Sequence, residues 1–128
     1  MPLLRTGRLI AHAATTDAYR SISFYKTLLG FAVLTNDEYA VAFNCNGTEL
    51  RLRKVEKVVP WPYTAVGWEV KNIEKVVEQL TSKGIKFERH SFLDQDALGV
   101  WRAPSGTFVA WFRDPDQNLL SVSEPGPK

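Results

Sequence analysis

The order strand, helix, strands occurs twice along this 128-residue chain, and neither copy is long enough to bury a core alone. The first copy has a helix predicted over Asp17–Gly30, and the second has one over Asn72–Gly84. Each helix starts at a side chain that can cap it and ends at a glycine. Two such units that pair would share a core and enclose a cleft, which is where function is expected.

The first copy starts with a strand predicted at residues 9–15. Its helix carries an apolar stripe at three- and four-residue steps, made of Tyr19, Ile22, Tyr25 (or Lys26) and Leu29. Strands are predicted at residues 31–35, 39–43 and 48–53, and the dipeptide Asn46-Gly47 favours a tight hairpin between the last two.

The second copy follows the same order, with strands predicted at residues 64–71, 85–92, 107–113 and 119–123. Its helix has the most regular amphipathic pattern in the chain, formed by Ile73, Val76, Val77 and Leu80. The pattern βαβββ therefore occurs twice and predicts an α+β fold. We expect one domain over residues 1–128, with a first module at about 8–55, a connector at about 56–63 and a second module at about 64–124.

The composition argues against several classes of protein, namely those that bind nucleic acid, contain disulfides or span membranes. Hydrophobic residues make up 45% and charged residues 23%, and the net charge of +2 includes no basic run long enough for nucleic acid. The single cysteine, Cys45, excludes an internal disulfide and is expected to be a buried apolar group. The apolar stretch near the start is too short for a signal peptide or a membrane span. We therefore expect a cytoplasmic protein with neither a nucleic acid nor a membrane as partner.

Two motifs carry a resemblance to a known family. They are FYKTLLGF at Phe24–Phe31, at the passage from helix to strand, and FRDPDQN at Phe112–Asn118, in the last hairpin. With the doubled βαβββ order, the chain resembles the vicinal oxygen chelate superfamily, which includes glyoxalase I, extradiol dioxygenases and bleomycin-resistance proteins. The resemblance implies two βαβββ modules forming a cupped mixed β-sheet, and a homodimer.

Metal-using members of this superfamily hold one divalent ion with four His, Gln or Glu side chains from the first and last strands of each module. Carried over to this chain, three of those positions are Ile10, Ala65 and Ser121, and the fourth is either Glu49 or Arg51. Isoleucine and alanine have no ligating side-chain atom, and a serine hydroxyl is a poor ligand. The resemblance thus implies the fold without the metal site, and we expect neither a metal nor another cofactor.

Strand side chains alternate between faces, so residues two apart from these positions share the predicted cup. The candidate ligand-binding residues are His12, Glu49, Arg51, Glu69, Trp101 and Ser121. His12 is either a general base or displaced ligand, or a satisfied polar residue on a strand. Arg51 and its neighbour Arg53 either clamp an anionic group or form ion pairs at the rim. Trp101 is either a lid over a flat ligand or an anchor for its loop.

Three further residues are assigned outside the cup. Trp68 and Trp111 are expected to pack under the helices or at a subunit contact, and the sequence leaves open which face of its strand Trp111 occupies. His90 is expected to be solvated and far from the cup strands.

The resulting hypothesis is a metal-free protein that binds, and sequesters, an aromatic or amphiphilic small molecule, as bleomycin-resistance proteins do. The alternative is a lyase, isomerase or dioxygenase of the same fold, with a non-standard metal site or acid–base chemistry at a histidine. A third reading is an interaction module for a protein partner. The sequence assigns no catalytic residue and leaves open whether the chain is an enzyme.

Overall fold

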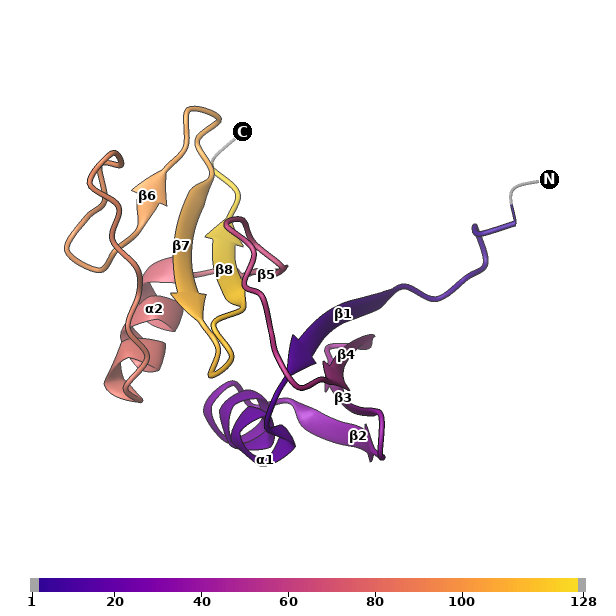
Figure 1. Cartoon of the computed structure of the whole chain (residues 1–128). Coiled ribbons are helices and arrows are strands. Elements are labelled where there is room, and N and C mark those ends of the chain that lie inside the picture. Colours follow the sequence, from indigo (N-terminus) through magenta and orange to yellow (C-terminus); the bar gives the residue numbers. More distant parts are fainter. Residues whose placement is uncertain (1–2, 127–128) are drawn as a thin grey trace. The chain divides into compact units, whose positions relative to one another are not determined.

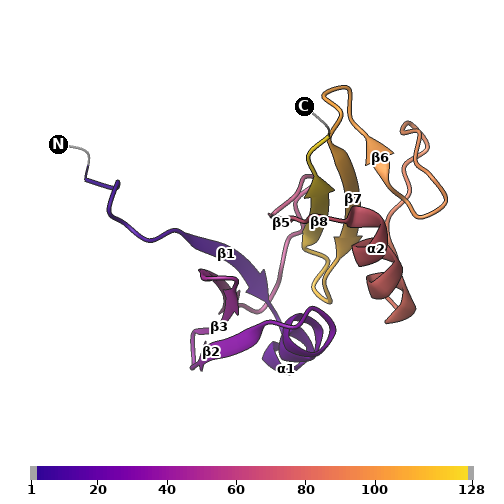
Figure 2. The same cartoon turned by 180° about the vertical axis from the view of Figure 1, so that it is seen from behind.

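The computed structural model describes residues 3–126. The chain divides into two compact units, which are Met1–Val58 (unit 1) and Val59–Lys128 (unit 2). Each unit contains one βαβββ set and one four-stranded mixed sheet (Figures 1 and 2). The predicted α+β class and the doubled βαβββ order are therefore confirmed.

Unit 1 is built around the sheet order β1-β4-β3-β2, in which β1 is parallel to β4 and the other neighbours are antiparallel. Its elements are β1 Ile10–Thr15, α1 Ala18–Ile22, the π-helix η1 Ser23–Leu28, β2 Ala32–Asn36, β3 Ala40–Cys45 and β4 Thr48–Lys54. The hairpin between β3 and β4 turns at Asn46 and Gly47, which have φ values of 53° and 93°. This is the left-handed geometry that the Asn-Gly pair favours.

The first helix is a correction to the sequence prediction. Asp17 caps it as expected, because its Oδ1 accepts hydrogen bonds from the backbone N–H groups of Tyr19 and Arg20. After Ile22, however, the α-helix gives way to η1, where the N–H of Leu29 donates to the carbonyl of Phe24. This bond joins residues five apart, one more than in the α-helix that the sequence predicts.

The buried face of this helical segment also differs from the predicted apolar stripe. Phe24 and Tyr25 are buried, and the ring of Tyr25 lies 5.2 Å from that of Phe43 in β3. Tyr19, which the periodicity places in the apolar stripe, is 84% exposed, so that assignment is wrong. The rest of the unit 1 core comes from alternate positions of the two central strands, namely Val41, Phe43, Leu50 and Leu52.

Unit 2 has the sheet order β5-β8-β7-β6, again with its first strand parallel to its last. Its elements are β5 Val66–Glu69, α2 Ile73–Ser82, β6 Trp101–Arg102, β7 Phe108–Arg113 and β8 Leu119–Glu124. The side chain of Asn72 caps α2, as predicted. The carboxylate of Glu124 also accepts a hydrogen bond from the N–H of Ile73 at 2.8 Å, which ties the start of α2 to the last strand.

Residues 85–92 do not form the predicted strand, and β6 lies instead at Trp101–Arg102. The amide of Gln95 explains the difference, because it takes up backbone groups that a strand would offer to a ladder. Its Oε1 accepts from the N–H of His90, and its Nε2 donates to the carbonyls of Glu88 and Gly99. Glu88 remains joined to β7 through its N–H, which donates to the carbonyl of Trp111 at 2.7 Å.

The core of unit 2 lies between α2 and one face of the sheet. Ile73 and Val77 of α2 are buried, and the helix contacts β7 and β8. The buried strand residues that face the helix are Ala110, Phe112, Leu120 and Val122. The opposite face of the same strands carries Trp111, Ser121 and their neighbours, which form the candidate site described below.

Candidate functional site

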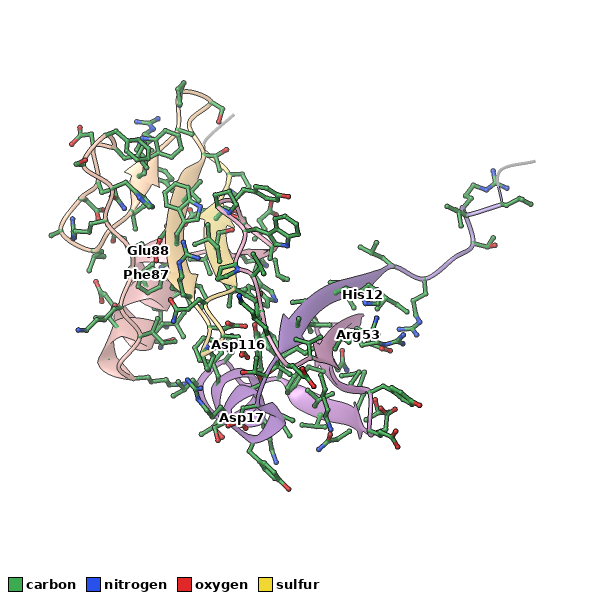
Figure 3. All side chains as sticks on the ribbon, viewed as in Figure 1. His12, Asp17, Arg53, Phe87, Glu88 and Asp116 are labelled. Atoms are coloured by element: carbon green, nitrogen blue, oxygen red, sulfur yellow. The ribbon has the colours of Figure 1, made fainter. Side chains whose placement is uncertain are left out.

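The predicted site residues of unit 1 lie together on one face of its sheet. In the β1–β4 register, Ile10 is paired with Glu49, and His12 is paired with Arg51. These side chains point away from the core positions Leu50 and Leu52, which alternate with them along β4. His12 is exposed, and it lies on the same face of the unit 1 sheet as Arg53, which stands two residues after Arg51; both are labelled in Figure 3.

Glu49 is the centre of an ion-pair network on this face. Its Oε2 accepts from Nε of Arg51 at 2.8 Å and lies 2.6 Å from Nη2 of the same residue. Its Oε1 lies 3.3 Å from Nη2 of Arg8. The hydrogen bond from Arg51 holds the pKa of Glu49 below its ordinary value, and the charge of Arg8 acts in the same direction. Arg51 therefore forms the ion pair that was one of its two predicted roles.

The positions that would hold a metal ion do not fit one. The side chains of Ile10 and Ala65 have no ligating atom. Within neither unit do three His, Cys, Asp or Glu side chains among residues 3–126 converge so that they can hold a metal ion. Glu49, one of the two candidates for the fourth carried-over position, is engaged by Arg8 and by the other candidate, Arg51.

The predicted site residues of unit 2 also share one sheet face. Ser121 lies between Gly67 of β5 and Trp111 of β7 in the register. A Cβ added at Gly67 would stand 2.6 Å from the Ser121 hydroxyl, so the serine occupies the space above the glycine backbone. One row further along the same face, Glu69 is exposed and pairs with Ser123.

Two indole rings cover the middle of this face. Trp101 of β6 and Trp111 of β7 are half-buried, and their ring centroids are 5.9 Å apart with an interplanar angle of 31°. Trp111 alternates with the core residue Phe112, so of its two predicted positions, under the helices or at a subunit contact, the first is wrong. Trp101 forms part of an aromatic surface, and the contact with Trp111 anchors it there.

His90 belongs to the same surface, which corrects the prediction that it is solvated and remote. Its ring lies 5.8 Å from that of Trp111 in an edge-on arrangement, and 5.3 Å from that of Phe92. We refer to Trp101, Trp111, His90 and Phe92 as the aromatic cluster. The alternation of Trp111 with Phe112 is a signal for its face, but His90 lies in an irregular segment that has no periodicity to place it.

A carboxylate and an arginine border the aromatic cluster. Nε of Arg113 donates to Oε2 of Glu88 at 2.7 Å, and Nε2 of His90 lies 3.9 Å from Oε1 of the same carboxylate. All three side chains are about one-quarter to one-third exposed. Sequence reasoning missed Glu88 because it stands in the segment that was predicted to be a regular strand.

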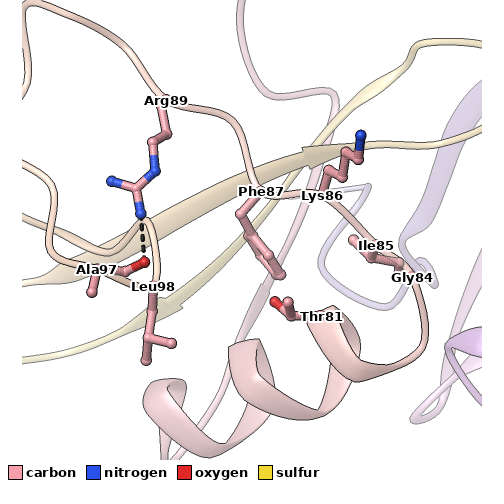
Figure 4. Close-up of a pocket in the computed structure, with 8 residues that line it drawn as sticks. All are labelled: Thr81, Gly84, Ile85, Lys86, Phe87, Arg89, Ala97 and Leu98. Atoms are coloured by element: carbon pink, nitrogen blue, oxygen red, sulfur yellow. Dashed lines mark hydrogen bonds between the residues drawn. The ribbon is translucent and has the colours of Figure 1, made fainter.

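A separate pocket lies on the helix side of unit 2, between the end of α2 and the segment that follows it (Figure 4). It encloses about 500 Å³ and is open to solvent, with Ile85, Phe87 and Leu98 among its apolar lining residues. The guanidinium of Arg89 donates to the carbonyl of Ala97, which closes one wall. The ring of Phe87 contacts Phe112, so this pocket is on the opposite side of the sheet from the aromatic cluster.

Among residues 3–126, no helix combines the length and apolar character that a membrane crossing requires. The family model described as Glyoxalase/Bleomycin resistance protein/Dioxygenase superfamily matches residues 9–122. No curated protein matches the sequence.

Solved structures share the fold at low sequence identity. A glyoxalase family protein from Bacillus anthracis is 17% identical with a TM-score of 0.74, and the match covers 98% of this chain and 99% of that one. Lactoylglutathione lyase from Agrobacterium tumefaciens is 16% identical, with a TM-score of 0.71 and 93% of each chain covered. TnmS3, an antibiotic binding protein from Streptomyces sp. CB03234, is 15% identical, with a TM-score of 0.67 and coverages of 94% and 97%.

Proposed function

The chain belongs to the glyoxalase/bleomycin resistance protein/dioxygenase superfamily, and from that premise we propose that it binds an aromatic or amphiphilic small molecule without a metal ion. One observation carries the proposal: paired indole rings occupy the sheet face of Ser121, and the resemblance assigns to Ser121 the position of a metal-binding glutamate. Side chains of this kind favour burial and stacking of a flat ligand rather than coordination of its oxygens. That one relative of the same fold is an antibiotic binding protein is consistent with this reading.

Stacking supplies most of the binding energy in this proposal. Burial of an apolar ligand face contributes about 25 cal/mol per Å², before the cost of association is subtracted. In unit 2, Trp101 provides the stacking surface, while Glu69 and Ser121 offer acceptors to polar groups. In unit 1, His12 and Arg51 bind polar or anionic groups, and Glu49 accepts hydrogen bonds from donor groups of the ligand, because their face presents both charges.

The test combines metal analysis with ligand titration. Protein purified without chelators is expected to contain far less than one equivalent of Zn, Ni, Mn or Fe per chain. It is expected to bind 2-naphthalenesulfonate, an aromatic amphiphile, in calorimetric titrations. Trp101→Phe weakens that binding because the smaller ring covers less of the ligand, whereas Trp61→Phe in the connector leaves it unchanged. His12→Ala is expected to fold normally, since His12 is exposed, and it tests separately whether the sheet face of unit 1 binds the probe.

Two results would count against the proposal. A stoichiometric transition metal that survives dialysis would favour the enzyme alternative, a lyase, isomerase or dioxygenase of the same fold. Equal losses from Trp101→Phe and Trp61→Phe would show that ligand binding does not use the sheet face of unit 2.

A homodimer is part of the same proposal. The edge strand β2 exposes Leu34, and Tyr39 beside β3 is 71% exposed. Edge strands with exposed apolar residues favour pairing with a second copy. Light scattering coupled to size exclusion is expected to give twice the 14.5 kDa mass of the chain, and a monomer at micromolar concentration would contradict it.

A further inference from the structure

We propose that His90 and Glu88, beside Trp111 and Trp101, form a recognition site for the hydroxyl group of an aryl ligand, an inference that rests on the proposed function. The ring of the ligand lies against the aromatic cluster. Its hydroxyl oxygen bridges Nε2 of His90 and Oε1 of Glu88. All of these residues belong to unit 2, so the site is complete within that unit.

The first argument is the separation of the two polar atoms. Nε2 of His90 and Oε1 of Glu88 are 3.9 Å apart, which is too long for a direct hydrogen bond. A single oxygen can lie about 2.8 Å from both atoms, accepting from the imidazole N–H and donating to the carboxylate. A hydroxyl oxygen does both, whereas a ring N–H can only donate and an ether oxygen can only accept.

The second argument is that both side chains are held in place while these two atoms stay available. Arg113 engages the other carboxylate oxygen of Glu88, at 2.7 Å. The backbone of His90 is fixed through its N–H, which donates to Oε1 of Gln95 at 2.7 Å. The imidazole is positioned further by its edge-on contact with Trp111. A site held in this way loses little entropy when it binds.

The third argument is the charge around the site. The carboxylate of Glu88 disfavours an anionic group at Oε1, and Arg113 compensates its charge, so there is no excess attraction for a cation. A neutral group with one donor and one acceptor suits these surroundings best. The side chains of His90 and Glu88 are 30% and 26% exposed, so a ligand can reach them while part of its surface is shielded from water.

The experiment compares two probes that differ by one methyl group, 2-naphthol and 2-methoxynaphthalene, in calorimetric titrations of the whole chain. A hydrogen bond to a charged acceptor predicts that 2-naphthol binds about tenfold more tightly than its methyl ether. His90→Phe keeps the ring contact with Trp111 and removes the N–H, and Glu88→Leu removes the acceptor. In both variants the ratio of the two affinities is expected to fall to near one. Glu78→Leu, on the exposed face of α2, is the matched control and keeps the ratio.

A second measurement does not depend on any variant. Addition of 2-naphthol to the wild-type protein is expected to move the imidazole ¹⁵N signals of His90 more than those of His12. An affinity ratio near one in the wild type, or a ratio that survives both substitutions, would overturn the hydroxyl site while leaving the binding of 2-naphthalenesulfonate intact. Binding of neither naphthalene probe would also overturn it. The proposed metal-free binding function is tested separately, by the metal content of the protein and by its titration with 2-naphthalenesulfonate.

Discussion

The hydroxyl of Ser121 lies 2.6 Å from the point where a Cβ on Gly67 would stand, across the parallel pair β5 and β8. Real Cβ atoms essentially never approach a neighbouring atom so closely. With the Ser121 hydroxyl in this place, only glycine fits at position 67 unless something shifts. The two residues therefore act as one packing unit on the sheet face that carries the aromatic cluster.

Gly67→Ala tests that relationship. We expect a loss of about 1–2 kcal/mol in the free energy of unfolding, at the low end for overpacking because a serine hydroxyl can rotate. Ser121→Ala in the same chain removes the obstructing oxygen and should recover most of the loss. Urea denaturation of the two single variants and the double variant gives the coupling. Purely additive losses would show that the clash is relieved elsewhere.

The ion pair of Glu49 with Arg51 predicts a pH effect. Since Arg51 holds the pKa of Glu49 below its ordinary value, Arg51→Gln should raise that pKa. A carboxyl group with a lowered pKa in the folded state stabilises the fold above its unfolded-state pKa. That contribution is lost as the pH falls through the folded-state pKa. The stability difference between wild type and Arg51→Gln should therefore be present at neutral pH and shrink in acid.

Carboxyl ¹³C NMR titration of Glu49 measures the shift directly. Arg53→Gln is the matched control, because Arg53 stands two residues further along the same strand and makes no ion pair in the described part of the chain. If both substitutions move the pKa of Glu49 equally, then general charge and not the hydrogen bond from Arg51 is its cause.

Gly30 ends the first helix with φ of +88°, and nothing lies within 4 Å of the place where its Cβ would be. The left-handed stop that the sequence predicts there is confirmed. Gly30→Ala should cost about 1 kcal/mol through backbone strain alone. Gly30→Asn should cost less, because asparagine tolerates this conformation better. Thermal melts of the two variants decide the point, and equal losses would indicate that a contact, not strain, is responsible.

Gln117 adopts a φ of +69° in the final hairpin, although it is not a glycine. Gln117→Gly should therefore stabilise the chain by about 0.5–1 kcal/mol, as strain relief exceeds the added flexibility of the unfolded chain. Asn46→Gly, at φ of +53°, serves as the comparison and should gain less, because asparagine is already suited to that region. Chemical denaturation that shows a larger gain at Asn46 would contradict this ranking.

Local signals were sufficient for much of the fold. The caps Asp17 and Asn72, the Asn46-Gly47 turn and the period-two alternation in the central strands each depend on neighbours in sequence. The strand predicted at residues 85–92 failed because the side chain of Gln95 satisfies backbone groups several residues away. No pattern of hydrophobicity reports such a bond.

The candidate site shows the same difference between features set by neighbours in sequence and features set by distant contacts. Alternation placed His12 and Arg51 on one face of unit 1, because a regular strand fixes direction at every second residue. His90 and Glu88 were missed, since an irregular segment offers no period from which to judge direction. Their approach to Trp111 depends on the tertiary path of residues 85–100, which the sequence does not encode locally.

In each unit the first strand is hydrogen-bonded in parallel to the last, so one ladder joins the beginning and the end of residues 10–54 in unit 1 and of residues 66–124 in unit 2. A gene half this length would already encode a polypeptide whose strand partners are all internal. Duplication of such a gene would have to add only a linker such as the proline-containing segment near Pro60 and Pro62. The surface chemistry of the two units is independent in the same way, because arginines lie on the exposed face of one sheet and indoles on that of the other.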